Sequence, residues 1–135
     1  LEESIFKNLQ SIVEERDRVL NEVATDLALS AVRIGPFRFV DARSKWKYRG
    51  VSALASKLYS ILKAPVILWV ASGKDYTLLV IKAPQGKAYR LAKILVAEGV
   101  ALDVAGHPNL AIAKIPASIT AEMLRERIQK AIYYV

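Results

Sequence analysis

Two neighbouring apolar runs in the middle of the chain most restrict the fold. Val66–Val70 is a continuous apolar stretch of strand length, and Tyr76–Ile81 is a second one. Such runs are expected for strands that are covered on both faces of a sheet. The segment Ser72–Asp75 between them is a turn, so we expect the two strands to pair as a hairpin.

Helical and extended patterns alternate around this hairpin. Apolar residues at three- and four-residue steps predict a long amphipathic helix over residues 2–30. The other expected elements are a hairpin or two short strands at Ala31–Ile34 and Phe37–Val40, a helix from Val51 that ends at Ala64-Pro65, a helix at Lys87–Glu98, a short strand or extended segment at Val100–Val104, a strand at Leu110–Ile115, and a last helix capped by Thr120 with Met123, Leu124, Ile128 and Ile132 as its apolar stripe. This order predicts an α/β fold with a mixed sheet of about five strands flanked by helices.

We divide the chain into a connector helix, residues 1–30, and one α/β domain, residues 31–135. The chain begins without an initiator methionine or a signal sequence, so we expect it to be part of a longer protein. The acidic first helix then either links this domain to one upstream, which we favour, or packs across its own sheet.

Length and composition predict a single soluble, cytoplasmic domain. The 135 residues are 53% hydrophobic, yet no run approaches the roughly 20 apolar residues of a membrane span. We therefore expect no membrane partner. Asn, Gln, Cys and Met together number seven, a low count of heat-labile residues that hints at a thermophilic source.

Positive charge is concentrated in the middle of the chain. The net charge is −4 over residues 1–30, +10 over residues 31–115 and +1 over residues 116–135. Such a field favours polyanions, and nucleic acid is the first partner to consider, although a solvated basic surface is an equal alternative. Within residues 41–50 the bases are interleaved with aromatic side chains, namely Arg43, Lys45, Trp46, Lys47, Tyr48 and Arg49. Bases and aromatic rings together suit single-stranded nucleic acid, unless the rings fill the core.

The only histidine, His107, follows Gly106 in a predicted turn before an apolar strand. A glycine there allows a close approach to a ligand that the imidazole also reaches; the alternative is an exposed histidine without a role. The sequence has no cysteine, and its few acids between residues 31 and 115 do not cluster. A metal centre or a nucleophilic catalytic site in this chain is therefore not expected.

The segment from Arg49 to Ile115 resembles the DHHA1 domain, the substrate-binding partner of the catalytic DHH domain in RecJ-type nucleases and related phosphoesterases. The resemblance rests on the helix that opens at Gly50-Val51, the strand after Ala64-Pro65, the hairpin and Ala105-Gly106-His107. It implies a mixed sheet flanked by helices, a connector before it, and a manganese centre in a DHH domain outside this chain, so that the chain itself needs no cofactor.

Two substrate-binding motifs of that family are altered here. An Arg-Ser pair corresponds to Lys82 and Ala83, and a Gly-Gly-His turn corresponds to Ala105-Gly106-His107. Because the guanidinium fork is lost, the resemblance implies a weaker phosphate grip and favours a non-catalytic, archaeal RecJ-like protein that works with GINS and MCM. The alternatives are the substrate-binding domain of an active DHH exonuclease or phosphoesterase, and a purely structural or protein-binding domain.

The predicted interface therefore binds single-stranded nucleic acid, DNA in preference to RNA, with replisome proteins as further partners. Its residues are Lys82, Lys87, Gly106 and His107, with Arg43, Lys45, Trp46, Lys47 and Arg49 from the loop.

Overall fold

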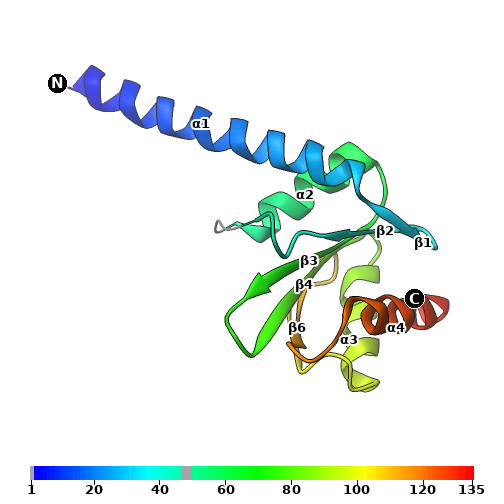
Figure 1. The fold of residues 1–135 in the computed structure, drawn as a ribbon. Helices are drawn as coiled ribbons and strands as arrows, with labels where there is room; N and C mark the ends of the chain where they lie inside the picture. Colours follow the sequence, from blue (N-terminus) through cyan, green and yellow to red (C-terminus); the bar gives the residue numbers. More distant parts are fainter. Residues whose placement is uncertain (1, 47–49) are drawn as a thin grey trace.

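A computed structural model describes residues 2–46 and 50–135 (Figure 1). In chain order its elements are α1 (Glu2–Leu29), β1 (Val32–Ile34), β2 (Phe37–Asp41), α2 (Val51–Leu62), β3 (Val66–Ser72), β4 (Tyr76–Lys82), α3 (Lys87–Ala97), β5 (Asp103–His107), β6 (Leu110–Pro116), α4 (Ala121–Ala131) and the short 3₁₀ helix η1 (Ile132–Tyr134). This succession of helices and strands confirms the predicted α/β class. None of the described helices is both long and apolar enough to cross a membrane.

The described strands form one mixed sheet in the order β1-β2-β3-β4-β6-β5. Strands β2 and β3 are parallel and are joined by the crossover helix α2, whereas every other neighbouring pair is antiparallel. The sheet has six strands rather than about five, because Asp103–His107 pairs with β6 as an edge strand.

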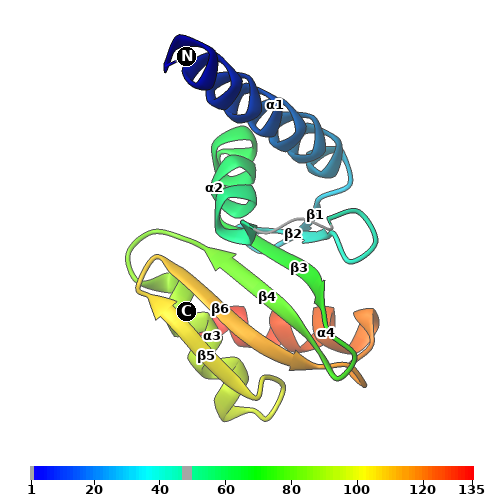
Figure 2. The same cartoon turned by 90° about the vertical axis from the view of Figure 1, so that its left-hand side faces the viewer.

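Helices lie on both faces of the sheet, as the continuous apolar strands predicted. Helices α3 and α4 lie on one face, while α2 packs on the other face against β3 and β4, and α1 packs on α2 (Figures 1 and 2). Along β3, Leu68 and Val70 belong to the core beneath α2, whereas Ile67 and Trp69 belong to the core against α3 and α4. The strand is therefore apolar at successive positions because each of its faces is buried.

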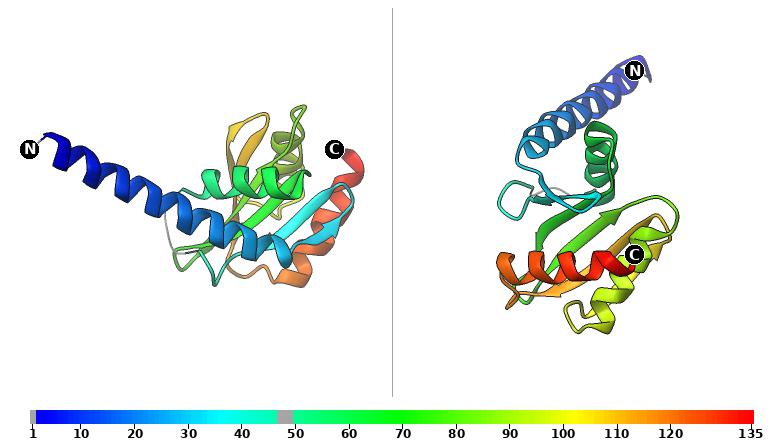
Figure 3. Two further views of the ribbon diagram at one scale, coloured as in Figure 1. Left: turned by 90° about the horizontal axis from the view of Figure 1, so that it is seen from above. Right: turned by 90° about the vertical axis from the view of Figure 1, so that its right-hand side faces the viewer.

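Helix α1 contacts the domain through its C-terminal part. Ala24 and Leu27 are fully buried, whereas Ile5 and Leu9 are more than half exposed. The N-terminal part of the helix extends away from the sheet (Figures 1 and 3). The alternative that α1 packs across its own sheet is thus wrong, and its role as a connector stays a prediction.

The start of α4 is as predicted. The Thr120 hydroxyl accepts a hydrogen bond from the Met123 backbone N–H at 3.2 Å, as an N-cap residue does. Met123 itself is 46% exposed, so its assignment to the apolar stripe was wrong. Leu124, Ile128 and Ala131 form the buried stripe.

Candidate nucleic-acid interface

Lys82 and His107 lie in one row across the sheet. Lys82 pairs with Leu110 across β4 and β6, and Leu110 pairs with His107 across β6 and β5. Directly paired residues point to the same face of a sheet, and neighbouring strands are about 4.8 Å apart. The Cα atoms of Lys82 and His107 are therefore about 10 Å apart, and both side chains belong to one face.

That face is open where the row crosses it. It is the α2 face, because Val66, which pairs with Lys82, lies in the core beneath α2. Helix α2 packs against β3 and β4, and Figure 2 shows no described helix in front of β6 and β5 on this face. The Lys82 side chain is half-buried and that of His107 is exposed. No described carboxylate forms an ion pair with Lys82, so its charge can interact with a ligand.

The turn between β5 and β6 joins this row to the start of α3. The Asn109 side-chain oxygen accepts a hydrogen bond from the Gly86 backbone N–H at 2.9 Å. The Pro108 carbonyl accepts one from the Tyr89 backbone N–H at 3.1 Å. Lys87 is the first residue of α3 and therefore lies at the same end of the sheet as Lys82 and His107.

Gly106 has a structural role that the sequence did not reveal. Gly106 and His107 end strand β5 and are not part of a turn; the turn is formed by Pro108 and Asn109. A Cβ atom on Gly106 would lie 2.3 Å from the Leu110 carbonyl oxygen, and its φ is +121°. The glycine is thus required for the close approach of β5 to β6. Its proximity to a ligand stays a prediction.

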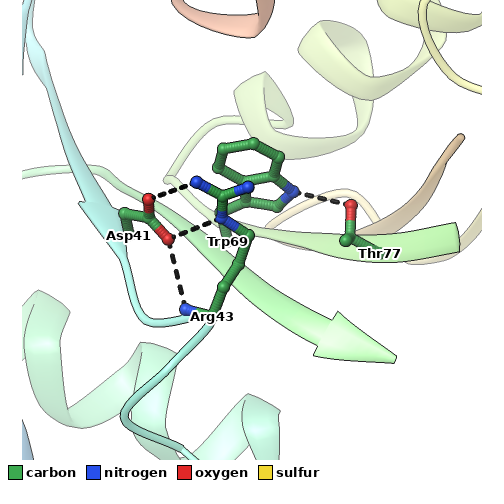
Figure 4. Close-up of polar contacts among 4 residues, drawn as sticks. All are labelled: Asp41, Arg43, Trp69 and Thr77. Carbon is green, nitrogen blue, oxygen red and sulfur yellow. Dashed lines mark hydrogen bonds and ion pairs between the residues drawn. The ribbon is translucent and has the colours of Figure 1, made fainter. Parts of the chain in front are cut away.

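Arg43 is separated from this row by the sheet. Its guanidinium forms an ion pair with Asp41, at 2.8 Å from Nη2 to Oδ2 and 3.0 Å from Nε to Oδ1, and stacks at 3.6 Å over the Trp69 ring (Figure 4). The Trp69 indole N–H donates to the Thr77 hydroxyl at 2.7 Å. Since Trp69 belongs to the core against α3 and α4, Arg43 lies on the face opposite to Lys82 and His107.

This pairing also affects the Asp41 carboxyl. Burial raises its pKa, but the hydrogen bonds from the Arg43 guanidinium and backbone N–H and the charge of Arg43 outweigh burial. The net effect is a pKa below the ordinary value of 3.8. Asp41 in turn raises the pKa of Arg43. The two groups neutralise each other, which leaves Arg43 less suited to bind a phosphate.

The other two described site residues of the loop, Lys45 and Trp46, do not join the row. The Trp46 side chain is only 8% exposed and lies in the core beneath α1 and α2. This burial agrees with the alternative that the loop aromatics fill the core, and a stacking role for Trp46 stays a prediction. Lys45 is exposed, with its Nζ atom 3.9 Å from the Asp26 carboxylate of α1. Lys47 and Arg49 lie outside the described residues.

Two arginines that the sequence analysis did not select share the row. Arg33 of β1 pairs with Arg38 of β2, and Arg38 pairs with Val66, the neighbour of Lys82. Their signal was the alternation of apolar and basic residues in these two strands, which places the bases on one face. Arg38 is half-buried and Arg33 is exposed. Buried Val66 separates both of them from Lys82.

Typical metal-ligating side chains are not clustered among the described residues. Within residues 2–46 and 50–135, no three histidine, cysteine, aspartate or glutamate side chains come close enough together to hold an ion. His107 and Lys82 therefore offer hydrogen bonds and charge to a ligand, without a metal ligand set around them.

Comparison with known proteins shows a likeness in structure. No protein-family model matches the sequence, and no curated protein matches it either. A crystal structure of RecJ with Mn²⁺ from Thermus thermophilus superposes with a TM-score of 0.62 and 18% sequence identity; the match covers 90% of this chain and 18% of that one. The pGpG-specific phosphodiesterase PggH from Vibrio cholerae matches with a TM-score of 0.56 and 11% identity, over 90% of this chain and 43% of that one.

This chain thus has the fold of a part of RecJ and of a part of PggH. It spans less than half the length of either protein. The likeness is consistent with the DHHA1 resemblance of the sequence. It extends over more of the chain than the segment from Arg49 to Ile115 that carried that resemblance.

Proposed function

We propose that this chain is a DHHA1-like module without a catalytic centre of its own, and that it binds the backbone of single-stranded nucleic acid, DNA in preference to RNA. The observation that carries the proposal is the row on the open face of the sheet. There Lys82, which forms no ion pair with a described residue, and the only histidine lie about 10 Å apart on one face.

The chemistry of this face supports a phosphate ligand. The Lys82 ammonium provides a point charge, and the exposed His107 imidazole provides a ring nitrogen for a hydrogen bond. Leu110 between them offers an apolar contact. Lys87 adds a further charge at the same end of the sheet. These contacts select a backbone and carry no information on sequence.

The likeness to RecJ and PggH favours the same class of ligand. PggH is described as a phosphodiesterase that acts on pGpG, which is a dinucleotide. We further propose that the parent protein is a RecJ-related replication or repair protein, in which this module holds the substrate. A replisome partner such as GINS would dock on the same basic domain.

The second candidate is the substrate-binding domain of an active DHH-family exonuclease or phosphoesterase. The RecJ structure with Mn²⁺ favours it, because a metal-containing relative shares this fold. The sequence that precedes residue 1 distinguishes the two: an Asp-His-His motif with companion aspartates upstream supports the enzyme, and degenerate positions there support the non-catalytic protein.

Binding of fluorescein-labelled dT20 to the 135-residue chain, followed by fluorescence anisotropy between 50 and 300 mM salt, tests the proposal. For four phosphate contacts we expect a slope of log K against log salt of about −3. Lys82→Ala and His107→Ala should weaken binding, whereas Lys74→Ala, in the β3–β4 turn at the other end of β4, should have little effect. No detectable binding, or binding independent of salt, would contradict the proposal.

A further inference from the structure

All charged side chains of helix α3 are positive. Its three charged side chains are Lys87, Arg90 and Lys93, and it contains no acid. Ala88, Leu91, Ala92 and Leu95 are its buried face, so Arg90 and Lys93 are exposed on the opposite side. No described acid forms an ion pair with any of the three bases.

Helix α4 on the same face of the sheet is different. It carries acids as well as bases, and its Lys130 ammonium lies 3.3 Å from the Glu126 carboxylate. Mixed charges with an ion pair are typical of a helix surface that faces only solvent. The uncompensated charge of α3 therefore distinguishes it from α4, its neighbour on this face of the sheet.

The position of Lys87 on α3 is unfavourable without a ligand. It lies in the first turn, where the helix dipole already contributes positive charge, and Arg90 and Lys93 follow it at three-residue steps. A base at a helix N-terminus is repelled by that dipole, whereas an anion there is attracted to both. A phosphate bound by these side chains would offset the repulsion between the bases and the helix dipole.

The strip on α3 has a fixed place relative to the row on the sheet. Two hydrogen bonds join the first turn of α3 to the β5–β6 turn, from Gly86 to Asn109 at 2.9 Å and from Tyr89 to Pro108 at 3.1 Å. The Lys93 ammonium lies 5.5 Å from the centre of the Tyr89 ring, which directs it toward that same first turn. Lys87 to Lys93 span about 9 Å along the helix axis.

We propose that Lys87, Arg90 and Lys93 form a second phosphate-binding strip that continues the Lys82–His107 row around the end of the sheet onto α3. This inference rests on the proposed function and specifies its ligand. One backbone reaches from the open face to the outer side of α3 only if it is a polynucleotide. A dinucleotide covers the row and does not reach Arg90 and Lys93.

A double variant with a matched control tests the strip. Arg90→Ala with Lys93→Ala removes one arginine and one lysine from the exposed side of α3, and Arg127→Ala with Lys130→Ala removes the same charges from α4. Alanine favours helix at every site. Circular dichroism of each variant verifies the fold, and anisotropy measures the binding of labelled dT2, dT6, dT12, dT20 and U20.

We expect the α3 double variant to bind dT20 about 25-fold more weakly at 0.1 M salt, with a salt slope reduced by about 1.4, because each phosphate contact contributes about 0.7 to that slope. Its affinity for dT2 should equal that of the unchanged protein, and the α4 control should bind dT20 as before. Tighter binding of dT20 than of U20 would identify DNA as the preferred ligand, and tighter binding of U20 would identify RNA.

Two results would overturn the strip and leave the proposed function intact. In the first, the α3 variant binds dT20 as tightly as the unchanged protein does, while Lys82→Ala weakens binding. In the second, the α3 variant loses the same factor in affinity for dT2 as for dT20. If Lys82→Ala and His107→Ala leave dT20 binding unchanged while the α3 variant abolishes it, the row does not bind the ligand and the proposed function is contradicted. Absence of binding to every oligonucleotide overturns both.

Discussion

The Arg43 guanidinium lies 3.6 Å from the centre of the Trp69 ring while it pairs with the Asp41 carboxylate. The loop that follows β2 is thereby attached to the core strand β3 on the α3 and α4 side of the sheet. A base that the sequence assigned to nucleic-acid binding is thus engaged within the domain. Its chemistry is still that of a phosphate-binding arginine, which explains why the sequence alone could not distinguish the two roles.

Arg43→Ala should therefore affect stability more than binding. We expect the free energy of unfolding to fall by about 1 kcal/mol, because the variant loses a cation–π contact and an ion pair whose side chains are about 40% exposed and thus screened by solvent. Arg43→Lys should recover only part of the loss, since an ammonium cannot form the two-atom contact. Urea unfolding measures both variants. If Arg43→Ala instead binds dT20 tenfold more weakly with unchanged stability, Arg43 contacts the nucleic acid as the sequence predicted.

The lowered pKa of Asp41 makes part of the stability depend on pH. A carboxyl whose pKa is lower in the folded protein stabilises the fold above its ordinary value of 3.8, and this contribution is lost as the pH falls through the folded-state pKa. Asp41→Asn should lower the free energy of unfolding at pH 7 by up to about 1 kcal/mol, given the exposure of the pair. The difference from the unchanged protein should shrink toward zero near pH 2. An equal difference at pH 7 and pH 2 would show that Asp41 acts by packing alone.

Gly106→Ala should disrupt the edge of the sheet. The new methyl group would lie 2.3 Å from the Leu110 carbonyl oxygen, on a backbone with φ of +121°. Backbone strain and steric overlap therefore both destabilise the variant. We expect a loss of about 3 kcal/mol. Gly73→Ala is the matched control, because φ there is +63° but no atom lies within 4 Å of the added carbon. It should lose about 1 kcal/mol. Equal losses in thermal unfolding would contradict the close approach of β5 to β6.

Trp46→Ala should behave as a core truncation. The side chain is 8% exposed in the cluster beneath α1 and α2, so we expect the free energy of unfolding to fall by about 3 kcal/mol. Trp46→Phe should restore most of it. If the alanine variant keeps its stability and loses affinity for dT20, then Trp46 stacks on bases as the sequence first indicated.

The fold could be predicted further than the site because it depends on local patterns. The runs at Val66–Val70 and Tyr76–Ile81 predicted covered strands, and Thr120 predicted a helix start; all three are confirmed. Strand β5 was missed as a complete strand because its outer residues are exposed and it contains a glycine, which weakens any strand pattern. Its existence depends on pairing with β6, and such pairing is not visible in a local window.

The site needed information that no local pattern contains. That Lys82 and His107 share a row follows from the register of three strands, and that Arg43 lies on the opposite face follows from its contact with Trp69. Burial of Trp46 could not be distinguished from stacking, because an aromatic residue between bases fits both. Composition predicted a polyanionic ligand, and only the topology separated the bases that share a surface from those that do not.

The change from arginine to lysine that the DHHA1 resemblance implied at Lys82 gives a final test of the row. Lys82 is the last residue of β4, half-buried beside Leu110 and without an ion pair among the described residues. A guanidinium in its place would present two parallel N–H donors to a phosphate. Lys82→Arg should therefore bind dT20 more tightly than the unchanged protein, whereas Lys82→Ala should bind about fivefold more weakly at 0.1 M salt, the effect of one phosphate contact. Equal affinity of all three proteins in the anisotropy assay would mean that no phosphate contacts this position, and the interface would then have to lie on another surface.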